Sequence, residues 1–335
     1  MLKIAFVEIE TDWEKVYLKK TFPSALFFSK PAQDVAVELA RAKIDVLSVF
    51  IKSKVDKTFL LKIPSLRLIT TRSTGFDHID TVFARKKGVT VCHVPVYGEN
   101  TVAEHTFALI LSLARQLRKA YLRTVQGNFS LDGLMGFDLK GKTLGVVGTG
   151  HIGMHVIRMG LGFGMKVIAF DVKPQNFLAE MLPFNYVGLK DLLKQSDIIT
   201  LHVPYMPATH HLINSKTLAH VKKGAVLINT SRGGLVDTSA LVKALDEKIL
   251  NAVGLDVLED EEYLLEEKRL LEESAKSKHW VKLKNTLKNH VLLARENVIY
   301  TPHMAFYSRE AVQRILDTTL ENIRAFANEN PIHQV

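Results

Sequence analysis

The chain has 335 residues, of which 47% are hydrophobic and 24% are charged, as in ordinary globular domains. This length favours two domains, and the single cysteine, Cys92, excludes a disulfide framework and indicates a small core residue in a reducing cytoplasm. A net charge of +9 could indicate a nucleic-acid or membrane partner, but the basic residues are scattered and the apolar runs are too short to span a bilayer. The composition therefore favours a cytoplasmic protein with a solvated basic surface that binds neither nucleic acid nor membrane.

The first hundred residues alternate short apolar runs with amphipathic segments. The apolar runs predict strands at residues 4–7, 26–28, 46–50, 68–71 and 89–93. The amphipathic segments predict helices that include residues 12–20, 34–42 and 80–86. Strands that alternate with helices are typical of a parallel sheet covered on both faces.

A long helix is expected after Pro95 and Gly98, which interrupt this alternation. Thr101 and Glu104 have the spacing of a capping box, so the helix is predicted to begin at Thr101 and to continue towards Arg118. The glycine-rich residues that follow, up to position 141, are expected to link this helix to a second unit.

The second unit repeats the alternation of strands and helices, with one helix expected at residues 152–163. Strands are predicted at residues 143–147, 166–170, 198–202, 225–228, 252–255 and 298–300. Their apolar runs are continuous, as in strands buried on both faces. Residues 262–296 are expected to form a helical insertion, and a last helix is expected at 308–327. The predicted domains are a discontinuous substrate domain, formed by 1–100 and 304–335, and a dinucleotide-binding domain at 101–303.

Three glycines form a G-x-G-x-x-G turn between a predicted strand and a predicted helix. Gly148 would allow the tight turn, Gly150 would let the backbone approach a pyrophosphate, and Gly153 would let the helix pack closely. The phosphates would meet the N–H groups at the start of the helix. Asp171 ends the next strand, where its charge would bind ribose hydroxyls and repel a 2′-phosphate, so NAD is expected rather than NADP.

His151 and His155 lie four residues apart on this helix, a spacing that two metal ligands could share. No third ligand or adjacent glutamate completes a zinc-protease pattern, so no metal site is expected. His151 and Ile152 are instead expected at the phosphate turn. The pair His210 and His211 is expected on a loop surface.

Two side chains at predicted strand ends suit chemistry on a substrate that carries a carboxylate. The guanidinium of Arg232 could bind a carboxylate in bidentate fashion, although a surface arginine would fit its position equally well. His303 follows Pro302, which restricts the backbone, and its imidazole can exchange a proton near neutral pH. The alternative is a hydrogen-bonded core histidine. Glu261, in an acidic run, is the candidate to fix its tautomer and favour the protonated ring.

With these features, the chain resembles the D-isomer-specific 2-hydroxyacid dehydrogenases, and most closely their NAD-dependent D-lactate dehydrogenase branch. The resemblance extends from about Leu47 to the last helix and includes, in order, the motifs at 71–80, 94–104, 148–153, 201–204, 228–233, 254–257 and 301–303. It implies two doubly wound parallel-sheet α/β domains, a flavodoxin-like substrate domain and a Rossmann NAD-binding domain. It also implies a homodimer formed through the helix near Thr101.

The resemblance implies a role for each of these residues. Arg232 would bind the substrate carboxylate and polarise the carbonyl, His303 would protonate the carbonyl oxygen, and Glu261 would hold the imidazole. Substrate contacts are implied for the N–H groups of Thr74 and Gly75 and for Tyr97 and Phe306. Cofactor contacts are implied for His202, Val203, Pro204, Thr230 and Asp256.

The implied reaction is the reversible reduction of pyruvate, or of a similar small 2-keto acid, by hydride transfer from NADH. One alternative is a reductase of another 2-keto acid, such as a branched 2-keto acid, hydroxypyruvate or glyoxylate. The other is a non-catalytic NAD-binding corepressor of the same fold. The sequence leaves open which 2-hydroxy acid is preferred.

Overall fold

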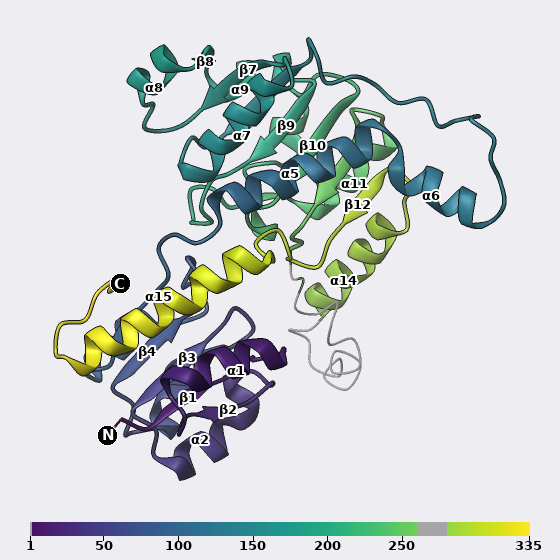
Figure 1. Ribbon diagram of the computed structural model, residues 1–335. Coiled ribbons are helices and arrows are strands. Elements are labelled where there is room, and N and C mark those ends of the chain that lie inside the picture. Colours follow the sequence, from purple (N-terminus) through teal and green to yellow (C-terminus); the bar gives the residue numbers. More distant parts are fainter. Residues whose placement is uncertain (1, 260, 262–279) are drawn as a thin grey trace. The chain divides into compact units, whose positions relative to one another are not determined.

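The computed structural model describes residues 2–259, 261 and 280–335. The chain divides into two compact units: unit 1 contains Met1–Gly98 and Tyr307–Val335, and unit 2 contains Glu99–Phe306. Each unit is built on its own parallel sheet, of five strands in unit 1 and seven in unit 2. Figure 1 shows that the last helix of the chain, α15 (Arg309–Ala327), returns to unit 1, where it packs on α1 (Asp12–Thr21) and β4 (Leu68–Thr71).

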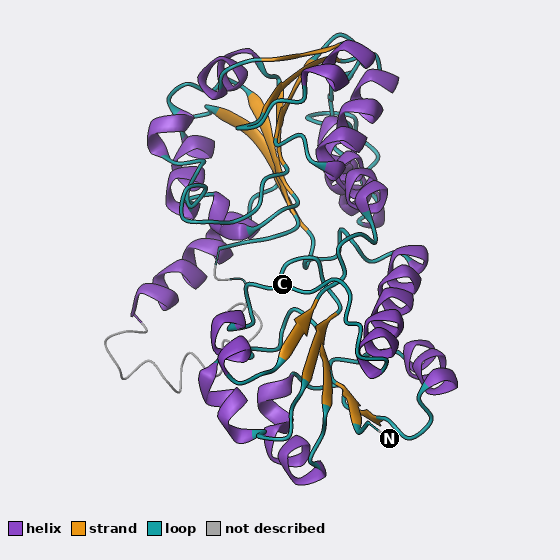
Figure 2. Ribbon diagram, turned by 90° about the vertical axis from the view of Figure 1, so that its left-hand side faces the viewer, coloured by secondary structure: helices purple, strands orange, loops and turns teal. Residues whose placement is uncertain are grey.

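The sheet of unit 1 has the strand order β2-β1-β3-β4-β5, which is the flavodoxin-like order, and every pairing is parallel. Its strands are β1 (Ile4–Phe6), β2 (Leu26–Phe27), β3 (Val46–Val49), β4 (Leu68–Thr71) and β5 (Thr90–Cys92). Besides α15, its helices are α1 (Asp12–Thr21), η1 (Ala32–Val35), α2 (Ala36–Ala42), α3 (Lys57–Lys62) and α4 (Thr81–Lys86). All residues of β1, β3 and β4 are buried, because helices cover both faces of the sheet (Figure 2).

The sheet of unit 2 has the order β12-β11-β10-β9-β6-β7-β8 and is also parallel throughout. Its strands are β6 (Thr143–Val147), β7 (Lys166–Phe170), β8 (Phe184–Tyr186), β9 (Ile198–Leu201), β10 (Ala225–Asn229), β11 (Leu250–Leu255) and β12 (Val298–Tyr300). The chain order reverses between β6 and β9, and ligands of such sheets bind beyond the carboxyl ends of the strands at this point. The two doubly wound sheets confirm the predicted fold class.

Helices again lie on both faces of the sheet of unit 2 (Figure 2). They are α5 (Glu99–Ala114), α6 (Leu117–Val125), α7 (His151–Gly162), α8 (Asn176–Met181), α9 (Leu189–Gln195), α10 (Ser215–Leu218), η2 (Gly233–Leu235), α11 (Thr238–Asp246) and α14 (Trp280–Leu293). The expected insertion at 262–296 lies outside the described residues up to position 279, and α14 accounts for most of the remainder.

The predicted start of the long helix is wrong. The helix α5 begins at Glu99, so Thr101 lies inside it and is buried, and Glu104 accepts a hydrogen bond from Asn100 Nδ2 at 3.1 Å instead of closing a capping box. The helix also ends at Ala114, because Gln116 adopts a left-handed conformation (φ 53°) before α6 begins. The burial of the apolar face, rather than the cap pattern, sets where this helix starts.

The side chain of Cys92 is fully buried at the end of β5, which confirms it as a core residue. Burial raises the pKa of its thiol to about 11, so the thiol stays protonated at neutral pH. Across residues 2–259, 261 and 280–335, none of the helices combines the length and apolar character needed to cross a membrane.

Candidate active site

The expected functional residues of unit 2 follow six neighbouring strands of one sheet. His303 comes after β12, Glu261 after β11 and Arg232 after β10. On the other side of this group, His202 follows β9, the glycine turn follows β6 and Asp171 follows β7. Because all the strands are parallel, their carboxyl ends share one edge, and this edge brings the expected residues of unit 2 together.

The glycine turn has the geometry of a phosphate-binding loop. Gly148 has φ +98°, and a Cβ there would lie 2.4 Å from the carbonyl oxygen of His202, while a Cβ on Gly153 would lie 2.0 Å from the carbonyl oxygen of Gly148. In contrast, the space around Gly150, the N-cap of α7, is open. No side chain caps α7, and its first N–H groups meet no backbone acceptor in the described part of the chain. The turn can therefore receive an anionic group.

Asp171 supports this turn from the end of β7. Its Oδ2 accepts hydrogen bonds from Thr149 N at 2.7 Å and Thr149 Oγ1 at 3.1 Å, and its Oδ1 accepts one from Lys173 N at 2.9 Å. Burial raises the pKa of Asp171, but the hydrogen bonds outweigh burial and the net pKa is lowered. Tyr186 in turn donates to Thr149 Oγ1 at 2.9 Å. The carboxylate therefore stays ionised beside the turn.

The first residues of α7 differ in exposure. The side chain of His151 is 82% exposed, with Nδ1 3.3 Å from Glu99 Oε1, whereas Ile152 is half-buried. His155 is also half-buried. Among the described residues, no three His, Cys, Asp or Glu side chains gather as a metal site would require.

At the end of β9, His202 lies against the glycine turn through its carbonyl oxygen, and Val203 also borders Gly148. The ring Nε2 of His202 lies 2.8 Å from Thr200 Oγ1, while its buried Nδ1 has no hydrogen-bond partner in the described structure. Burial lowers the pKa of His202 to about 3, so the ring is neutral. A polar group of a bound cofactor could satisfy Nδ1, so these residues fit a dinucleotide.

Pro204 and Thr230, two further residues expected at the cofactor, differ from each other in exposure. Pro204 is exposed, and its carbonyl oxygen accepts a hydrogen bond from Thr209 Oγ1 at 2.7 Å. Thr230 is buried after β10, where its Oγ1 lies 2.9 Å from Oγ1 of Thr106 on α5. The hydroxyl of Thr230 thus ties the sheet edge to α5.

His303 and Glu261 form the contact that the sequence predicts. His303 Nδ1 lies 2.7 Å from Glu261 Oε1, and Glu261 Oε2 accepts a hydrogen bond from Leu258 N at 3.0 Å. A carboxylate can only accept, so Nδ1 carries the hydrogen and Nε2 is left to exchange a proton. The backbone of His303 is left-handed, with φ 54°, and its N–H donates to Asp256 O at 2.8 Å. Both side chains are about a quarter exposed.

Asp256 shapes the loop that carries this imidazole. Its buried carboxylate accepts hydrogen bonds from Thr301 Oγ1 at 2.5 Å, Met304 N at 2.9 Å and Ala305 N at 2.8 Å. Burial raises the pKa of Asp256, and these hydrogen bonds offset the effect only in part. His105 of α5 lies 3.5 Å from the same carboxylate, a contact that sequence reasoning missed.

Arg232 lies in extended backbone directly before η2 and is half-buried. Its Nη1 donates to Ser231 O at 2.9 Å, and its carbonyl oxygen accepts from Asn229 Nδ2 at 2.9 Å. The next residue, Gly233, touches the turn that leads to Glu261, because a Cβ on Gly233 would lie 1.9 Å from Leu258 O. The loops after β10 and β11 therefore pack directly against each other.

The expected substrate residues fall in both units. In unit 1, Thr74 lies exposed in the loop after β4. Its carbonyl oxygen is within hydrogen-bond distance of His93 Nδ1, at 3.0 Å. Within the described part of the chain, the N–H groups of Thr74 and Gly75 meet no backbone acceptor, so they can bind an anion. Tyr97 is half-buried in unit 1, and Phe306 is half-buried at the end of unit 2.

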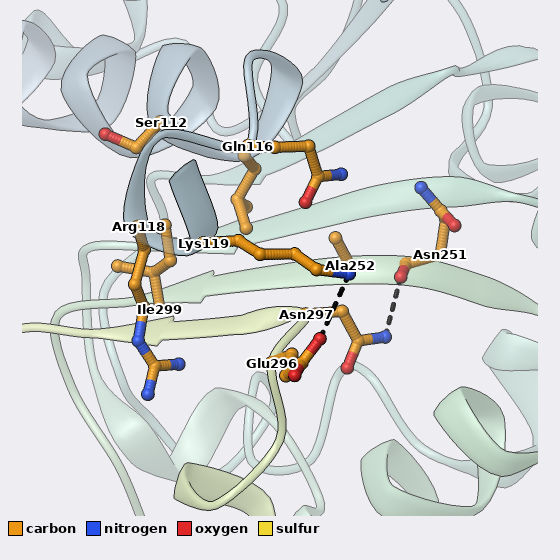
Figure 3. A pocket seen from close by; sticks show the side chains of 10 residues that line it. Ser112, Gln116, Arg118, Lys119, Asn251, Ala252, Glu296, Asn297 and Ile299 are labelled. Atoms are coloured by element: carbon orange, nitrogen blue, oxygen red, sulfur yellow. Dashed lines mark hydrogen bonds and ion pairs between the residues drawn. The ribbon is translucent and has the colours of Figure 1, made fainter. Parts of the chain in front are cut away.

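A small polar pocket lies elsewhere on unit 2, as Figure 3 shows. It is lined by Gln116 after α5, by Lys119 of α6, and by Asn251 and Asn297, which lie near the starts of β11 and β12. These residues mark the amino ends of the strands. The pocket is therefore at the opposite end of the sheet from the glycine turn and the imidazole.

Comparison with known proteins gives consistent results. Residues 107–305 match the family described as D-isomer specific 2-hydroxyacid dehydrogenase, NAD binding domain. The chain is 41% identical to the 2-hydroxyacid dehydrogenase homolog 1 of Schizosaccharomyces pombe, over 86% of this chain and 84% of the relative. It is 38% identical to the D-lactate dehydrogenase of Escherichia coli, over 78% and 77%.

Solved structures show the same relationship. The D-lactate dehydrogenase of Aquifex aeolicus, complexed with NAD and lactic acid, superposes with a TM-score of 0.86 at 39% identity, and the match covers 98% of this chain and 96% of that one. The pyruvate reductase of Chlamydomonas reinhardtii superposes with a TM-score of 0.86 at 36% identity, over 99% and 98%. The chain therefore belongs to the family of D-isomer specific 2-hydroxyacid dehydrogenases and is an NAD-dependent oxidoreductase.

Proposed function

We propose that the protein is a D-lactate dehydrogenase, which reduces pyruvate or a similar small 2-keto acid to the D-2-hydroxy acid. The observation that carries this proposal is the 2.7 Å contact between His303 Nδ1 and Glu261 Oε1, on the same sheet edge as Arg232. This reaction needs a proton donor, which the imidazole supplies, and a group that orients the imidazole, which the carboxylate supplies. It also needs a site for the substrate carboxylate, which the guanidinium supplies. The similarity to D-lactate dehydrogenases of known structure supports pyruvate as the substrate.

In this proposal, Arg232 binds the substrate carboxylate. A planar guanidinium can pair with both carboxylate oxygens, which fixes the orientation of the keto acid. The same cation stabilises negative charge that develops on the carbonyl oxygen. Arg232 follows β10, and its loop is packed against the turn of Glu261 through Gly233, so the two groups are held on one rigid edge.

His303 then moves the proton. NADH, when bound, would supply the hydride, and Nε2 of the imidazolium would give its proton to the carbonyl oxygen. The carboxylate of Glu261 on Nδ1 favours the charged ring during reduction and fixes the tautomer of the neutral ring during oxidation. The overall reaction therefore consumes one proton in the reductive direction and releases one in the oxidative direction.

The remaining residues would bind either the cofactor or the substrate. NAD would be held by Gly148, Gly150, His151, Ile152, Gly153 and Asp171, together with His202, Val203, Pro204, Thr230 and Asp256. In this scheme residues 101–303 form the NAD-binding domain, and residues 1–100 and 304–335 form the substrate domain. Thr74, Gly75, Tyr97 and Phe306 would contact the substrate.

A substrate panel tests this proposal. NADH oxidation is measured with pyruvate, glyoxylate, hydroxypyruvate and a branched 2-keto acid, and the product is analysed on a chiral column. We expect pyruvate to give the highest kcat/KM and D-lactate as the product. A higher kcat/KM with another keto acid would reassign the substrate, an L product would contradict the stereochemistry, and no turnover with any of them would favour a non-catalytic NAD-binding protein.

We further propose that the protein is a homodimer formed through α5, α6 and the loop after α6. Figure 1 shows α6 and this loop extending away from the sheet of unit 2. Their apolar side chains are 48% to 92% exposed: Leu117, Tyr121, Leu122, Val125, Phe129, Leu131 and Met135. Exposed apolar side chains concentrated in one segment mark a protein-interaction surface, and a second copy of the chain would cover them.

Sedimentation velocity tests the dimer. We expect the wild type to sediment as a dimer and the double variant Phe129→Asp, Leu131→Asp to sediment as a monomer. The matched control is the double variant Val37→Asp, Val82→Asp, which places the same charge at two valines of unit 1 that are each 67% exposed. A monomeric wild type would contradict the proposal, as would a double variant that remains dimeric.

We also propose that the protein acts in the cytoplasm. The free, buried Cys92 and a pyridine-nucleotide cofactor support this location. Cell fractionation with a tagged chain tests it, and recovery in a membrane or secreted fraction would contradict it.

A further inference from the structure

A second histidine–carboxylate pair lies next to the first in unit 2. His211 Nε2 is 2.7 Å from Glu259 Oε1, and the two side chains are 30% and 19% exposed. The ring of His210 stacks on His211, with centroids 3.8 Å apart. The sequence predicts both histidines only as a loop surface, but His211 is directed to a carboxylate two residues before Glu261. Neither residue of this pair takes up or releases the proton in the reaction described above.

The pair acts on the turn from Leu258 to Glu261. Within this turn, Glu261 N donates to Leu258 O at 3.3 Å, and Leu258 N donates to Glu261 Oε2 at 3.0 Å. The orientation of the Glu261 carboxylate therefore depends on where the peptide of Leu258 is held.

Three contacts from outside hold this turn. His211, in the loop between β9 and α10, binds the side chain of Glu259. Asn289 of α14 donates to Glu259 O at 3.0 Å. Gly233, after Arg232, approaches so closely that a Cβ would lie 1.9 Å from Leu258 O. Of these three contacts, only the one from His211 involves a titratable side chain.

His211 is itself fixed by its backbone. Its N–H donates to Gly234 O at 2.9 Å, and its carbonyl oxygen accepts from Asn214 Nδ2 at 2.7 Å. The residue has a left-handed backbone, with φ 49°. Tyr205, in the same loop as His211, packs on the loop that follows Arg232, because a Cβ on Gly234 would lie 2.6 Å from the Tyr205 ring. The histidine thus connects the arginine loop to the turn that carries Glu261.

We propose that His211 and Glu259 are positioning residues that hold the Glu261 carboxylate on His303, and the proposal rests on the function proposed above. A histidine on the loop after β9 fixes Glu259, and Glu259 fixes the turn. Glu261 then stays within hydrogen-bond distance of Nδ1. Neither His211 nor Glu259 contacts the reacting atoms.

Other titratable groups lie next to the two histidine–carboxylate pairs and also act on the two histidines. Next to Glu261 and His303 lie the carboxylate of Asp256 and the phenol of Tyr300. Burial and the negative charges of Glu261 and Asp256 raise the pKa of Tyr300 to about 12, so this phenol stays neutral. Next to His211 lie Glu259 and the ring of His210, whose Nδ1 lies 3.1 Å from Tyr205 Oη. His211 can only be neutral or cationic, so its removal would by electrostatics alone leave the His303 midpoint unchanged or raise it, and a fall in a His211 variant is transmitted through the turn.

The experiment measures the titration of His303 directly and then its effect on turnover. Ring-labelled histidine NMR, with the His303 signal assigned by its loss in His303→Gln, is recorded against pH for wild type, His211→Ala and Glu259→Gln. We expect the His303 midpoint to fall by about half a pH unit in both variants, because a loosened Glu261 stabilises the imidazolium less well. Reduction of pyruvate at a pH above the midpoint should then fall about threefold, mainly in kcat, with NADH affinity unchanged.

Two further variants separate positioning from general damage. His211→Gln can still donate to Glu259 and should restore most of the midpoint, whereas His220→Ala, at an exposed histidine of the same unit, should match wild type. An unchanged His303 midpoint in His211→Ala would overturn the proposal, as would an equal loss of activity at every pH. A wild type without turnover would remove the proposed function, while the NMR midpoints would still decide the role of the pair.

Discussion

The carboxyl edges of the two sheets use buried charge in opposite ways. In unit 1, the guanidinium of Arg72 is buried and donates to Val7 O at 2.7 Å and Glu8 O at 3.0 Å. The carboxylate of Glu8 accepts from Phe50 N and Lys52 N, both at 2.8 Å. These charges are bonded to the backbone of the unit itself. In unit 2, the edge has an open glycine turn, a neutral His202 with one unpartnered nitrogen, and a histidine that keeps Nε2 for exchange.

The difference shows that charge at a strand end does not by itself mark a reactive site. Arg72 and Glu8 bind carbonyl oxygens and N–H groups, so they stabilise the ends of β1, β3 and β4. Arg232 and His303 lie in loops that close backbone contacts hold rigidly, which leaves their side chains suited to a ligand. The predictions below change one group on the edge of unit 1 and three on the edge of unit 2, from the largest expected effect to the smallest.

Replacing Arg72 with Met should give the largest change, and it should be a change in stability. The substitution removes the donors that satisfy buried carbonyl groups and the buried cation whose charge interacts with Glu8, which we expect to cost about 3–5 kcal/mol in unit 1. Hydrogen exchange of the amides in β1, β3 and β4 measures the loss. The control Arg67→Met removes an exposed arginine that lies over Phe326 and should cost less than about 1 kcal/mol. Equal losses in the two variants would mean that Arg72 has no special role.

Replacing Arg232 with Lys should leave the fold intact and lower activity. Lysine keeps the charge but loses the planar fork, so kcat/KM for pyruvate should fall by roughly two orders of magnitude. NADH affinity, followed by its fluorescence, should stay near the wild-type value. If the lysine variant keeps near-normal kcat/KM, a point charge is sufficient and the bidentate geometry is wrong.

Replacing Asp171 with Ala should change the choice of cofactor. The pKa of this carboxyl group is lowered, so its charge is present throughout the neutral range and would repel a 2′-phosphate. We expect the wild type to have a higher kcat/KM with NADH than with NADPH. In the variant, the ratio of these two kcat/KM values should fall by about tenfold. Because Asp171 also bonds Thr149 N, affinity for both cofactors should fall somewhat. A wild type that prefers NADPH would contradict this assignment.

Replacing His202 with Gln should leave stability at neutral pH least affected and should remove a pH dependence of stability in acid. Burial lowers the pKa of His202 to about 3, so the folded ring stays neutral where the unfolded ring, with a pKa of 6.5, takes up a proton. Its contribution is therefore fully present above pH 6.5 and is lost as the pH falls towards 3, by up to about 1.4 kcal/mol per pH unit. Urea unfolding of the apo protein between pH 8 and about pH 5 measures the difference between wild type and variant. Parallel curves would show that the ring is protonated in the folded state.

Much of the edge of unit 2 could be predicted from the sequence, because its functions need particular residue types at strand ends. Gly148 requires a left-handed backbone and Gly153 a close approach, so their spacing is a strong signal. The contact between Glu261 and His303 could be anticipated from the family resemblance, because the acidic run alone does not distinguish Glu261 from the carboxylates beside it. The parallel pairing of both sheets followed from the alternation of strands and helices, whereas their doubly wound order was implied by the family resemblance.

The rest depends on contacts between residues far apart in the chain. The pairing of His211 with Glu259 joins positions 48 residues apart, and nothing in the local sequence distinguishes it from a surface loop. The same holds for Asp256, whose carboxylate is bonded to the loop after β12. The capping box at Thr101 was misread because burial of the helix face overrode a local pattern. These tertiary contacts cannot be predicted from local propensity or from motif spacing.

The central claim is that His303, held by Glu261, moves the proton, and the pH dependence of the two directions tests it most directly. The measurement is kcat/KM against pH for pyruvate reduction and for D-lactate oxidation, in wild type and Glu261→Gln. We predict that reduction declines at high pH and oxidation declines at low pH around one shared midpoint, and that Glu261→Gln moves both profiles to lower pH by about one unit. Profiles that fall on the same side in both directions, or a Glu261→Gln profile that coincides with wild type, would contradict the account.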